Sequence, residues 1–391
     1  MELFMPKIMK PKVHLCSVTT ISLTLRSFLI EQLLFLQQHG LDVTVVCSYD
    51  SAFEKDLSST LEYRPVEMAR SISFLASLRS VFLMYSLFKR ERFDMIQYST
   101  PKAALVASVA GCFAGVPVRL YCQWGIRYVG FAGWKRFFFK LFEKLTCLLS
   151  THISPDSFGN REFSIAEGLY SKGKSSVVYH GSANGVNLAR FDHNRRTNFR
   201  EEMRREIGIK TEFVFGWVGR VTKDKGVHEL ISAFVEIASD EDSILLMIGD
   251  MEENHGLPAS TIQLLFNHPR IKYLGRKGEI EKYYSAMDVL VVPSYREGFG
   301  VVALEAQAMG VPVITTDIPG PREAVIDGKT GILVPPATIQ PLANAMKKLY
   351  DDPLLLSKMS GNGIQYVREK FDQVVFWEKV LEHRQWLLTK S

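Results

Sequence analysis

The stretch Arg296–Pro312 combines residue types that suit a phosphorylated ligand. It follows the apolar run Val289–Val292, which predicts a buried strand, and its composition favours a helix from Val301 onward. A glycine loop between a strand and a helix presents unpaired backbone N–H groups and the positive end of a helix dipole, and both attract an anion. Gly298 and Gly300 would let the backbone approach such a ligand closely.

Two carboxylates flank this loop, Glu297 inside it and Glu305 in the helix that follows. A carboxylate beside a phosphate would repel it, so both are better suited to accept hydrogen bonds from hydroxyl groups. A ligand with hydroxyls on both sides of a diphosphate is a nucleotide sugar. The alternative interpretation is that Glu305 is an exposed helix residue and that the glycines form an ordinary turn.

The elements that must position this loop alternate between strands and helices. In the first half, a helix is expected at 25–38, and apolar runs predict strands at 12–17, 41–48, 63–67, 93–98, 116–123, 152–154 and 175–179. In the second half, they predict strands at 213–218, 243–248, 271–274, 289–292, 313–315 and 332–334. Repeated strand–helix–strand units form parallel sheets that are covered on both faces.

The two series predict an α/β protein with two Rossmann-like domains, and 391 residues suffice for both. We expect an N-terminal domain over residues 1–185 and a C-terminal domain over residues 186–370, with the linker at 181–196. The ligands of such sheets bind at the carboxyl ends of the strands, which places the predicted site in a cleft between the domains. The tail at 371–391 is helical and rich in aromatic residues.

The chain also resembles a known family. Two glutamates separated by seven residues are the signature of retaining glycosyltransferases of the GT-B group, and the matching run here is EGFGVVALEAQAMGVPVI. The run GVPVRLYCQWGIRYVG is similar to the acceptor domain of capsule and O-antigen transferases that extend a polyprenyl-diphosphate-linked sugar. The resemblance implies a GT-B fold in which the C-terminal helix crosses back to the first domain.

The resemblance implies roles for residues of the second half. In the family, the arginine and the second lysine of a pattern like GRVTKDKG bind the donor diphosphate, which assigns Arg220 and Lys225. A guanidinium binds phosphate oxygens bidentately, whereas an ammonium acts as a mobile point charge. A solvated basic turn is the alternative. The resemblance implies that Arg220, Lys225 and Glu297 are catalytic groups and that Glu297 contacts the transferred sugar. It assigns Glu305 to the ribose and Arg276 to the base or ribose of the donor. The remaining implied donor contacts are Gly298, Phe299 and Gly300.

In the first half, two residues after strands are candidate acceptor contacts, Thr19 and Lys102. Lys102 is equally well explained as a charge on a helix surface. Many family members carry a histidine where this chain has Trp124, so a group usually linked to the transferred sugar is missing. We assign a structural role to His180 and none to the turn at 319–323.

Composition limits the class of protein. A hydrophobic content of 47% with 23% charged residues describes a globular protein. The five cysteines form no CxxC pair, which favours buried thiols in a reducing compartment over disulfides or zinc. Met1–Lys12 lacks the apolar core of a secretory signal, and the histidines lack metal-ligand spacing.

Positive charge is concentrated in the first half. Residues 1–190 carry 22 Lys and Arg against 14 Asp and Glu, a net charge of +8, which leaves −3 for the remainder of the total of +5. This asymmetry favours an anionic partner: nucleic acid, an acidic membrane face or a phosphorylated acceptor. Nucleic acid is the least favoured partner, because no nucleic-acid-binding motif accompanies the basic residues.

A basic and aromatic segment at residues 119–144 contributes to this charge. It holds six basic residues among phenylalanines, with Glu143 as its single acid. Such a segment suits the headgroup region of an anionic bilayer. The alternative is a helix whose aromatics face the core. The uncharged run at 103–118 is shorter than the roughly 20 residues that span a membrane, so we expect peripheral association with the inner face of the plasma membrane.

Together these features predict a retaining glycosyltransferase of the cytoplasm. We expect it to transfer a hexose or N-acetylhexosamine from a UDP-sugar to a lipid-diphosphate-linked saccharide in bacterial surface polysaccharide biosynthesis. Cationic side chains and a helix end would replace a metal, so no metal or other cofactor is expected, and a front-face substitution needs no nucleophile. The alternatives are a phosphorylase or a nucleotide-sugar epimerase of the same fold, or a non-catalytic scaffold at the membrane.

Overall fold

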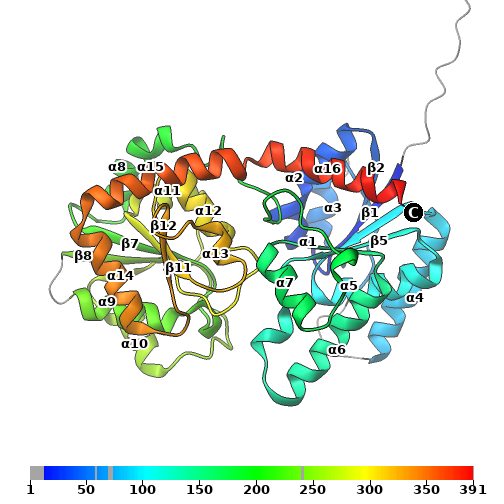
Figure 1. Cartoon of the computed structure of the whole chain (residues 1–391), viewed down its shortest axis with the longest axis horizontal. Coiled ribbons are helices and arrows are strands. Elements are labelled where there is room, and N and C mark those ends of the chain that lie inside the picture. The colour runs from blue at the N-terminus through cyan, green and yellow to red at the C-terminus, as the bar shows by residue number, and fades with distance from the viewer. Residues whose placement is uncertain (1–12, 58–59, 69–73, 239–241, 391) are drawn as a thin grey trace, which may run out of the picture. The chain divides into compact units, whose positions relative to one another are not determined.

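The computed structural model describes residues 13–57, 60–68, 74–238 and 242–390. Their contacts divide the chain into two compact units, each built on its own parallel sheet (Figure 1). Unit 1 contains the chain up to Pro155, Ser164–Val178 and the chain from Trp377 onward, and unit 2 contains Asp156–Phe163 and Tyr179–Phe376. The two units are described separately below.

Unit 1 holds a six-stranded sheet in the order β3-β2-β1-β4-β5-β6. Its strands are β1 (Val13–Val18), β2 (Leu41–Val46), β3 (Glu62–Tyr63), β4 (Met95–Tyr98), β5 (Val118–Gln123) and β6 (His152–Pro155). Its helices are α1 (Ser22–Thr24), α2 (Ile30–Gln38), α3 (Ser51–Leu57), α4 (Phe74–Glu91), α5 (Pro101–Ala114) and α6 (Gly133–Leu149), with most of α16 (Gln373–Thr389). All neighbouring strands are parallel, as the sequence predicted.

Three expectations for unit 1 were wrong in detail. A π-helical turn at Leu25–Leu29 joins α1 to α2, so the helix expected at 25–38 begins at Ser22. The strand expected at 63–67 is regular only at Glu62–Tyr63, although the amides of Arg64 and Val66 still donate to the carbonyls of Val45 and Cys47. The segment 175–179 forms only a single bridge to Ile153, and its last residue, Tyr179, has a left-handed φ of 53°.

Lys12, at the start of the first expected strand, and the rest of Met1–Lys12 lie outside the described residues.

Unit 2 holds a second six-stranded parallel sheet in the order β12-β11-β10-β7-β8-β9. Its strands are β7 (Phe213–Val218), β8 (Ser243–Ile248), β9 (Ile271–Tyr273), β10 (Val289–Val292), β11 (Val313–Thr316) and β12 (Gly331–Val334). Its helices are α8 (Arg196–Glu206), α9 (Val227–Ala238), α10 (Ala259–Asn267), α11 (Ile280–Ala286), α12 (Val301–Ala308), α13 (Pro321–Ala324), α14 (Ile339–Asp351) and α15 (Pro353–Lys370). Helix α7 (Phe158–Ala166) begins in unit 2 and ends in unit 1.

Both faces of the second sheet are buried. Successive strand residues point to opposite faces, so Val214 and Leu246 join one hydrophobic cluster while Phe215 and Leu245 join another. This explains why the strands of unit 2 are nearly continuous apolar runs that could be located closely from the sequence.

The division of the chain differs from the expected boundary at residues 185 and 186. Asp156–Phe163 belongs to unit 2 because its polar groups bond there: the backbone of Ser182 donates to the carbonyl of Asp156 over 2.6 Å. The C-terminal helix α16 joins unit 1 from Trp377 onward, as the family resemblance implied. Its buried Arg384 donates from Nε to the Gln97 side chain over 3.1 Å.

Candidate active site

The predicted donor-binding residues of unit 2 all follow carboxyl ends of strands in one sheet. Arg220 comes after β7, Arg276 after β9 and Glu297 after β10. In a parallel sheet these ends lie along the same edge, which is where ligands of doubly wound sheets bind. The topology therefore brings these residues to one side of unit 2.

The glycine loop between β10 and α12 has the backbone that its sequence predicted. Gly300 caps α12 with φ +86°, a conformation that favours glycine. Phe299 is buried at 2% exposure and packs on Phe371, with the ring centres 5.4 Å apart. Within the described parts of the chain, the amides of Gly298, Phe299 and Gly300 have no hydrogen-bond acceptor. They are available to an anion.

Lys225 meets the glutamate of this loop. Its Nζ lies 2.5 Å from Glu297 Oε1, which also accepts a hydrogen bond of 2.9 Å from the Ser294 hydroxyl. The Lys225 and Glu297 side chains are only 16% and 15% exposed, so water screens their attraction weakly. The structure thus brings together two predicted catalytic residues that are 72 positions apart in the chain.

Backbone contacts join the loop that carries Lys225 to the loop after β10. The amide of Tyr295 donates to the carbonyl of Asp224 over 2.8 Å, and Arg296 pairs with the Asp224 carboxylate at 2.9 Å. A Cβ at Gly226 would lie 2.0 Å from the carbonyl oxygen of Pro293, so only glycine fits this approach.

The two predicted arginines are more exposed than Lys225. Arg220, 53% exposed, pairs with Glu252, and Arg276, 64% exposed, lies 3.6 Å from Asp250. Exposed pairs of this kind contribute little to stability, so an anionic ligand can replace their carboxylate partners at small cost.

Glu305 is neither fully exposed nor unpartnered. It is half-buried in α12, and its Oε2 accepts a 2.9 Å hydrogen bond from the phenol of Tyr284, a fully buried residue at the end of α11. Burial raises the Glu305 pKa to about 7, against the opposing effects of the Tyr284 hydrogen bond and of Arg190. The interpretation of Glu305 as an ordinary surface residue is wrong.

The candidate acceptor residues lie at the carboxyl end of the first sheet. Thr19 is fully buried, and its hydroxyl donates to the carbonyl of Ile21, so its side chain is directed away from a ligand. The neighbouring Thr20 is half-buried and bonds through its hydroxyl to that of Thr100 over 2.8 Å. Lys102 lies half-buried in the first turn of α5, directly after Thr100.

Two residues that make long-range hydrogen bonds near this site escaped the sequence reasoning. Asn160 Nδ2 donates to the Gly298 carbonyl over 2.9 Å, although the two residues are 138 positions apart. Glu323, in the turn to which no role was assigned, accepts hydrogen bonds from the amides of Phe158 and Gly159. No local pattern identifies such long-range pairs. The available signal was the cluster of small and polar residues directly after β6.

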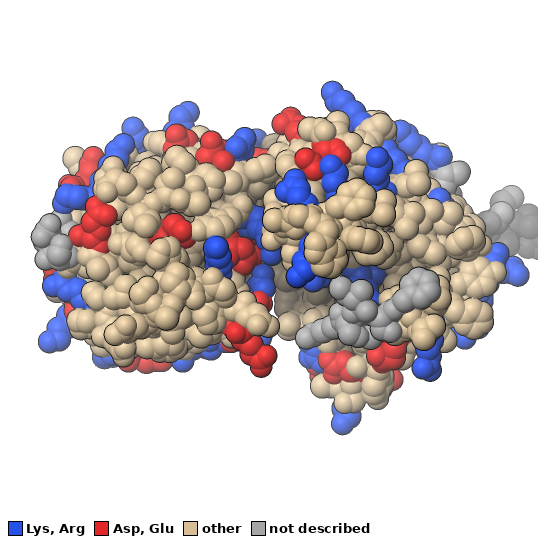
Figure 2. Space-filling view, turned by 90° about the horizontal axis from the view of Figure 1, so that it is seen from below, with Lys and Arg blue, Asp and Glu red and all other residues tan. Residues whose placement is uncertain are grey.

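Helix α6 in unit 1 turns its large apolar residues outward. Helices α4 and α6 both pack against α5, and Figure 2 shows a broad uncharged surface on this side of unit 1. The inward positions of α6 are polar instead: Glu143 is buried and accepts hydrogen bonds from Tyr121 and Gln123. The interpretation in which the aromatics face the core is therefore wrong. The exposed apolar residues of α6 are Trp134, Phe137, Phe138, Leu141, Phe142, Leu145 and Leu148.

Among the described residues, no helix is long and apolar enough to cross a membrane. The same residues contain no group of three or more His, Cys, Asp or Glu side chains arranged to hold a metal ion.

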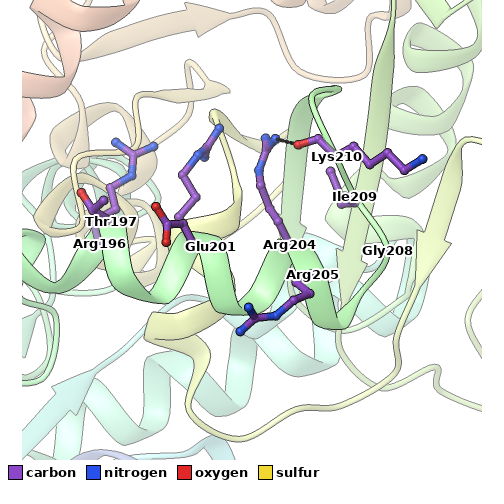
Figure 3. Close-up of a pocket in the computed structure, with 9 residues that line it drawn as sticks. Arg196, Thr197, Glu201, Arg204, Arg205, Gly208, Ile209 and Lys210 are labelled. Atoms are coloured by element: carbon purple, nitrogen blue, oxygen red, sulfur yellow. Dashed lines mark hydrogen bonds between the residues drawn. The ribbon is translucent and has the colours of Figure 1, made fainter.

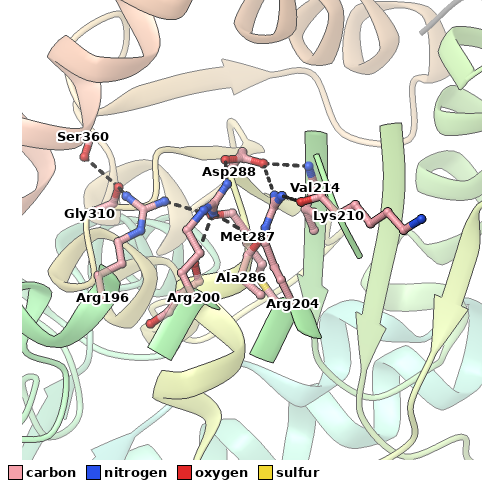
Figure 4. Close-up of polar contacts among 11 residues, drawn as sticks. Arg196, Arg200, Arg204, Lys210, Val214, Ala286, Met287, Asp288, Gly310 and Ser360 are labelled. Atoms are coloured by element: carbon pink, nitrogen blue, oxygen red, sulfur yellow. Dashed lines mark hydrogen bonds and ion pairs between the residues drawn. The ribbon is translucent and has the colours of Figure 1, made fainter. Parts of the chain in front are cut away.

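A cavity of about 910 Å³ beside α8 holds a second cationic cluster, but this cluster is structural (Figure 3). Arg196, Arg200 and Arg204 lie four residues apart and donate to backbone carbonyls after α11 and α12 (Figure 4). Arg200 and Arg204 also bind opposite oxygens of Asp288, at 2.6 and 2.9 Å. Because Asp288 accepts from the amide of Val214 near the start of β7, this cavity lies at the amino ends of the strands.

Comparison with known proteins identifies the family. Residues 199–366 match the model of "Glycosyl transferases group 1", and residues 17–154 match the model of "Glycosyl transferase 4-like". Over 352 residues the chain is 33% identical to the capsular polysaccharide biosynthesis glycosyltransferase CapM of Staphylococcus aureus, covering 89% of this chain and 91% of CapM. It is 26% identical to the UDP-Gal:alpha-D-GlcNAc-diphosphoundecaprenol alpha-1,3-galactosyltransferase of Escherichia coli, covering 84% and 86% of the two chains.

Solved structures confirm the GT-B fold. Anabaena HepE, solved in complex with UDP and glucose, superposes with a TM-score of 0.79 at 20% identity, covering 95% of this chain and 99% of HepE. Sucrose-phosphate synthase from Thermosynechococcus elongatus superposes with a TM-score of 0.78 at 19% identity, covering 97% of this chain and all of that one (100%). The fold agrees with the relatives and family models above, and the 33% identity to CapM over 91% of its length shows that the chain belongs to the group 1 glycosyl transferases and is a glycosyltransferase enzyme.

Proposed function

We propose that this enzyme is a retaining glycosyltransferase of bacterial surface polysaccharide biosynthesis. It transfers a hexose or N-acetylhexosamine from a UDP-sugar to a lipid-diphosphate-linked saccharide. The names of CapM and of the Escherichia coli galactosyltransferase support the pathway and the acceptor class, and the UDP bound to HepE supports the nucleotide. The observation that carries the proposal is the meeting of Lys225 with Glu297 beside the unpaired amides of the glycine loop.

The leaving group of this reaction is a nucleoside diphosphate, whose negative charge grows as the sugar departs. Groups that stabilise such charge in the transition state make the largest contribution to catalysis. Lys225, Arg220 and the amides of Gly298–Gly300 supply these groups, and none of them depends on a metal. In this assignment Arg276 contacts the base or ribose.

The two glutamates bind hydroxyl groups of the donor. Glu305 accepts from the ribose, and its Tyr284 partner leaves the second carboxylate oxygen for that bond. Glu297 exchanges part of its contact with Lys225 for a hydroxyl of the transferred sugar. With Glu297 engaged in this way, departure of the diphosphate and attack by the acceptor occur on the same face of the sugar, which retains its configuration.

The acceptor contacts we propose are Thr20 in place of the buried Thr19, together with Lys102. The exposed apolar residues of α6, from Trp134 to Leu148, form a surface that we call the α6 stripe. The α6 stripe binds the cytoplasmic face of an anionic membrane, because Lys135 and Lys144 are exposed beside the aromatic residues. Peripheral binding of this kind would bring the enzyme to a lipid-linked acceptor.

The reaction is tested by incubating the enzyme with a panel of UDP-sugars and a synthetic polyprenyl-diphosphate saccharide. We expect UDP release with an extended acceptor, and NMR of the product should show the anomeric configuration of the donor. An inverted product would refute retention. Phosphate-dependent sugar release would identify a phosphorylase, and conversion of the UDP-sugar without an acceptor would identify an epimerase.

Membrane binding is tested by co-sedimentation with vesicles. Phosphatidylglycerol vesicles should bind the enzyme, phosphatidylcholine vesicles should bind it weakly, and Phe137→Glu should abolish the difference. Phe266→Glu is the matched control, since Phe266 is similarly exposed, at 59%, but lies on α10 of unit 2. Equal binding by the Phe137 variant and the wild type would exclude the α6 stripe as the membrane surface.

A further inference from the structure

The segment that follows β6 holds the backbone of the glycine loop through a side-chain hydrogen bond. Asp156–Phe163 belongs to unit 2, while the residues before and after it belong to unit 1. Its Asn160 is buried at 5% exposure, and its Nδ2 donates to two acceptors at 2.9 Å, the carbonyl of Gly298 and the carboxyl oxygen Oδ1 of Asp156. A residue far from the signature motif therefore holds the motif's own backbone.

Asn160 is itself held in place. Its backbone amide donates to the Ser157 hydroxyl over 3.1 Å. Directly before it in the chain, the backbone amides of Phe158 and Gly159 donate to the Glu323 carboxylate at 2.8 and 2.6 Å, which fastens the start of α7 to α13. The Asn160 side chain therefore has little freedom to follow a moving loop.

Two glycines pack their backbone closely against the glycine loop. A Cβ at Gly320 would lie 1.8 Å from the Gly298 carbonyl oxygen, and a Cβ at Gly181 would lie 2.7 Å from the Phe299 ring. Both glycines have positive φ, +93° and +90°. No side chain fits at either position, so the backbone packs directly against the loop.

This arrangement fixes the direction of one amide. In a planar trans peptide the carbonyl oxygen and the following N–H point in opposite directions. Because the Gly298 oxygen is directed to Asn160, the N–H of Phe299 is directed away from it, and no acceptor for that N–H occurs within the described chain.

We propose that Asn160 is a positioning residue that aims the Phe299 amide at a phosphate of the nucleotide donor. The inference rests on the proposed function, in which this loop binds the donor diphosphate. Asn160 does not touch the ligand. It acts by preventing the Gly298–Phe299 peptide from turning over.

The test compares the binding of UDP, inorganic pyrophosphate and uridine, measured by calorimetry and, for weak ligands, by ligand-observed NMR. Asn160→Ala should weaken UDP and pyrophosphate binding about tenfold and leave uridine binding unchanged, because only the phosphates use the amide. Asn160→Asp, which keeps the shape but cannot donate when ionised, should give the same pattern at pH 8. Asn362→Ala is the control, since the Asn362 amide also donates to a backbone carbonyl, that of Lys329, at 3.0 Å.

Equal weakening of UDP and uridine would reduce Asn160 to a general structural role and overturn the proposal. Unchanged UDP binding in both folded variants would overturn it as well. A wild-type enzyme that binds pyrophosphate in an Asn160-dependent manner but not UDP would contradict the proposed nucleotide while supporting the positioning role. A wild type that binds neither would overturn both.

Discussion

The two ends of the second sheet both gather charged residues, but the groups there have different partners. At the amino ends, Arg196, Arg200 and Arg204 donate to backbone carbonyls, and Arg200 and Arg204 also to Asp288. At the carboxyl ends, the partners of Arg220 and Lys225 among the described residues are carboxylates, and the neighbouring loop amides find no acceptor among these residues. A cavity of about 910 Å³ lies beside the amino-end cluster, yet its cations already serve the fold. Polar groups that have no partner within the protein identify a binding site better than the volume of a cavity or the number of charges around it.

Loss of Lys225 tests the carboxyl end most directly. Lys225→Ala should lower kcat/KM about 100- to 1000-fold, since removing one donor from a charge-stabilising site costs about 2.7–4 kcal/mol. Lys223→Ala, an exposed lysine in the same turn, is the control for kinetics with a UDP-sugar. Undiminished turnover in the Lys225 variant would exclude it as a catalytic group.

Loss of Arg204 should have the opposite signature. Arg204→Met removes a charge-assisted hydrogen bond to Asp288 and bonds to two carbonyls, so the free energy of unfolding should fall by about 1.5–3 kcal/mol. UDP binding by the folded variant should be unchanged. Urea denaturation measures the loss, with Arg205→Met, an exposed neighbour, as control. Weakened UDP binding without a loss of stability would mean that Arg204 serves ligand binding and not the fold.

Asp156, which accepts a hydrogen bond from Asn160 beside the glycine loop, should make the stability of the protein depend on pH. Burial raises the Asp156 pKa from its usual value of 3.8 to about 7, so the folded state holds a proton that the unfolded state has already released between these values. The contribution of Asp156 to stability is therefore present below about pH 4 and is lost as the pH rises toward 7, by up to about 1.4 kcal/mol per pH unit.

Asp156→Asn should flatten this part of the stability profile, measured by denaturant titration between pH 4 and 8. Asp351→Asn, at an exposed position, is the control substitution in the same measurement. An unchanged slope in the Asp156 variant would mean that the buried carboxyl does not titrate in this range.

The smallest effect is expected at Tyr284. Tyr284→Phe removes the hydrogen bond to Glu305 and should weaken UDP binding about fivefold, roughly 1 kcal/mol. Tyr283→Phe, at a buried neighbour with no such bond among the described residues, is the control in the same calorimetric titration. Equal effects of the two substitutions would deny Tyr284 a part in orienting Glu305.

The strands of unit 2 could be located closely from sequence because they are apolar on both faces and end at clear turn residues, as Val289–Val292 does before Pro293. The donor motifs could be found because their residues are close in the chain and resemble a known family. Thr19 was the poorer choice beside Thr20, since two adjacent threonines give no indication of which side chain the fold turns inward.

By itself, the sequence determined the two parallel sheets, the strand–loop–helix at Gly298–Gly300 and the family, because local periodicity and short motifs carry that information. Tertiary structure alone decided that Lys225 meets Glu297, that Tyr284 holds Glu305 and that Asn160 holds Gly298. It also decided that the aromatic residues of α6 face outward. These outcomes depend on side-chain directions and on hydrogen bonds between distant segments, which exist only once the strands have been ordered in their sheets.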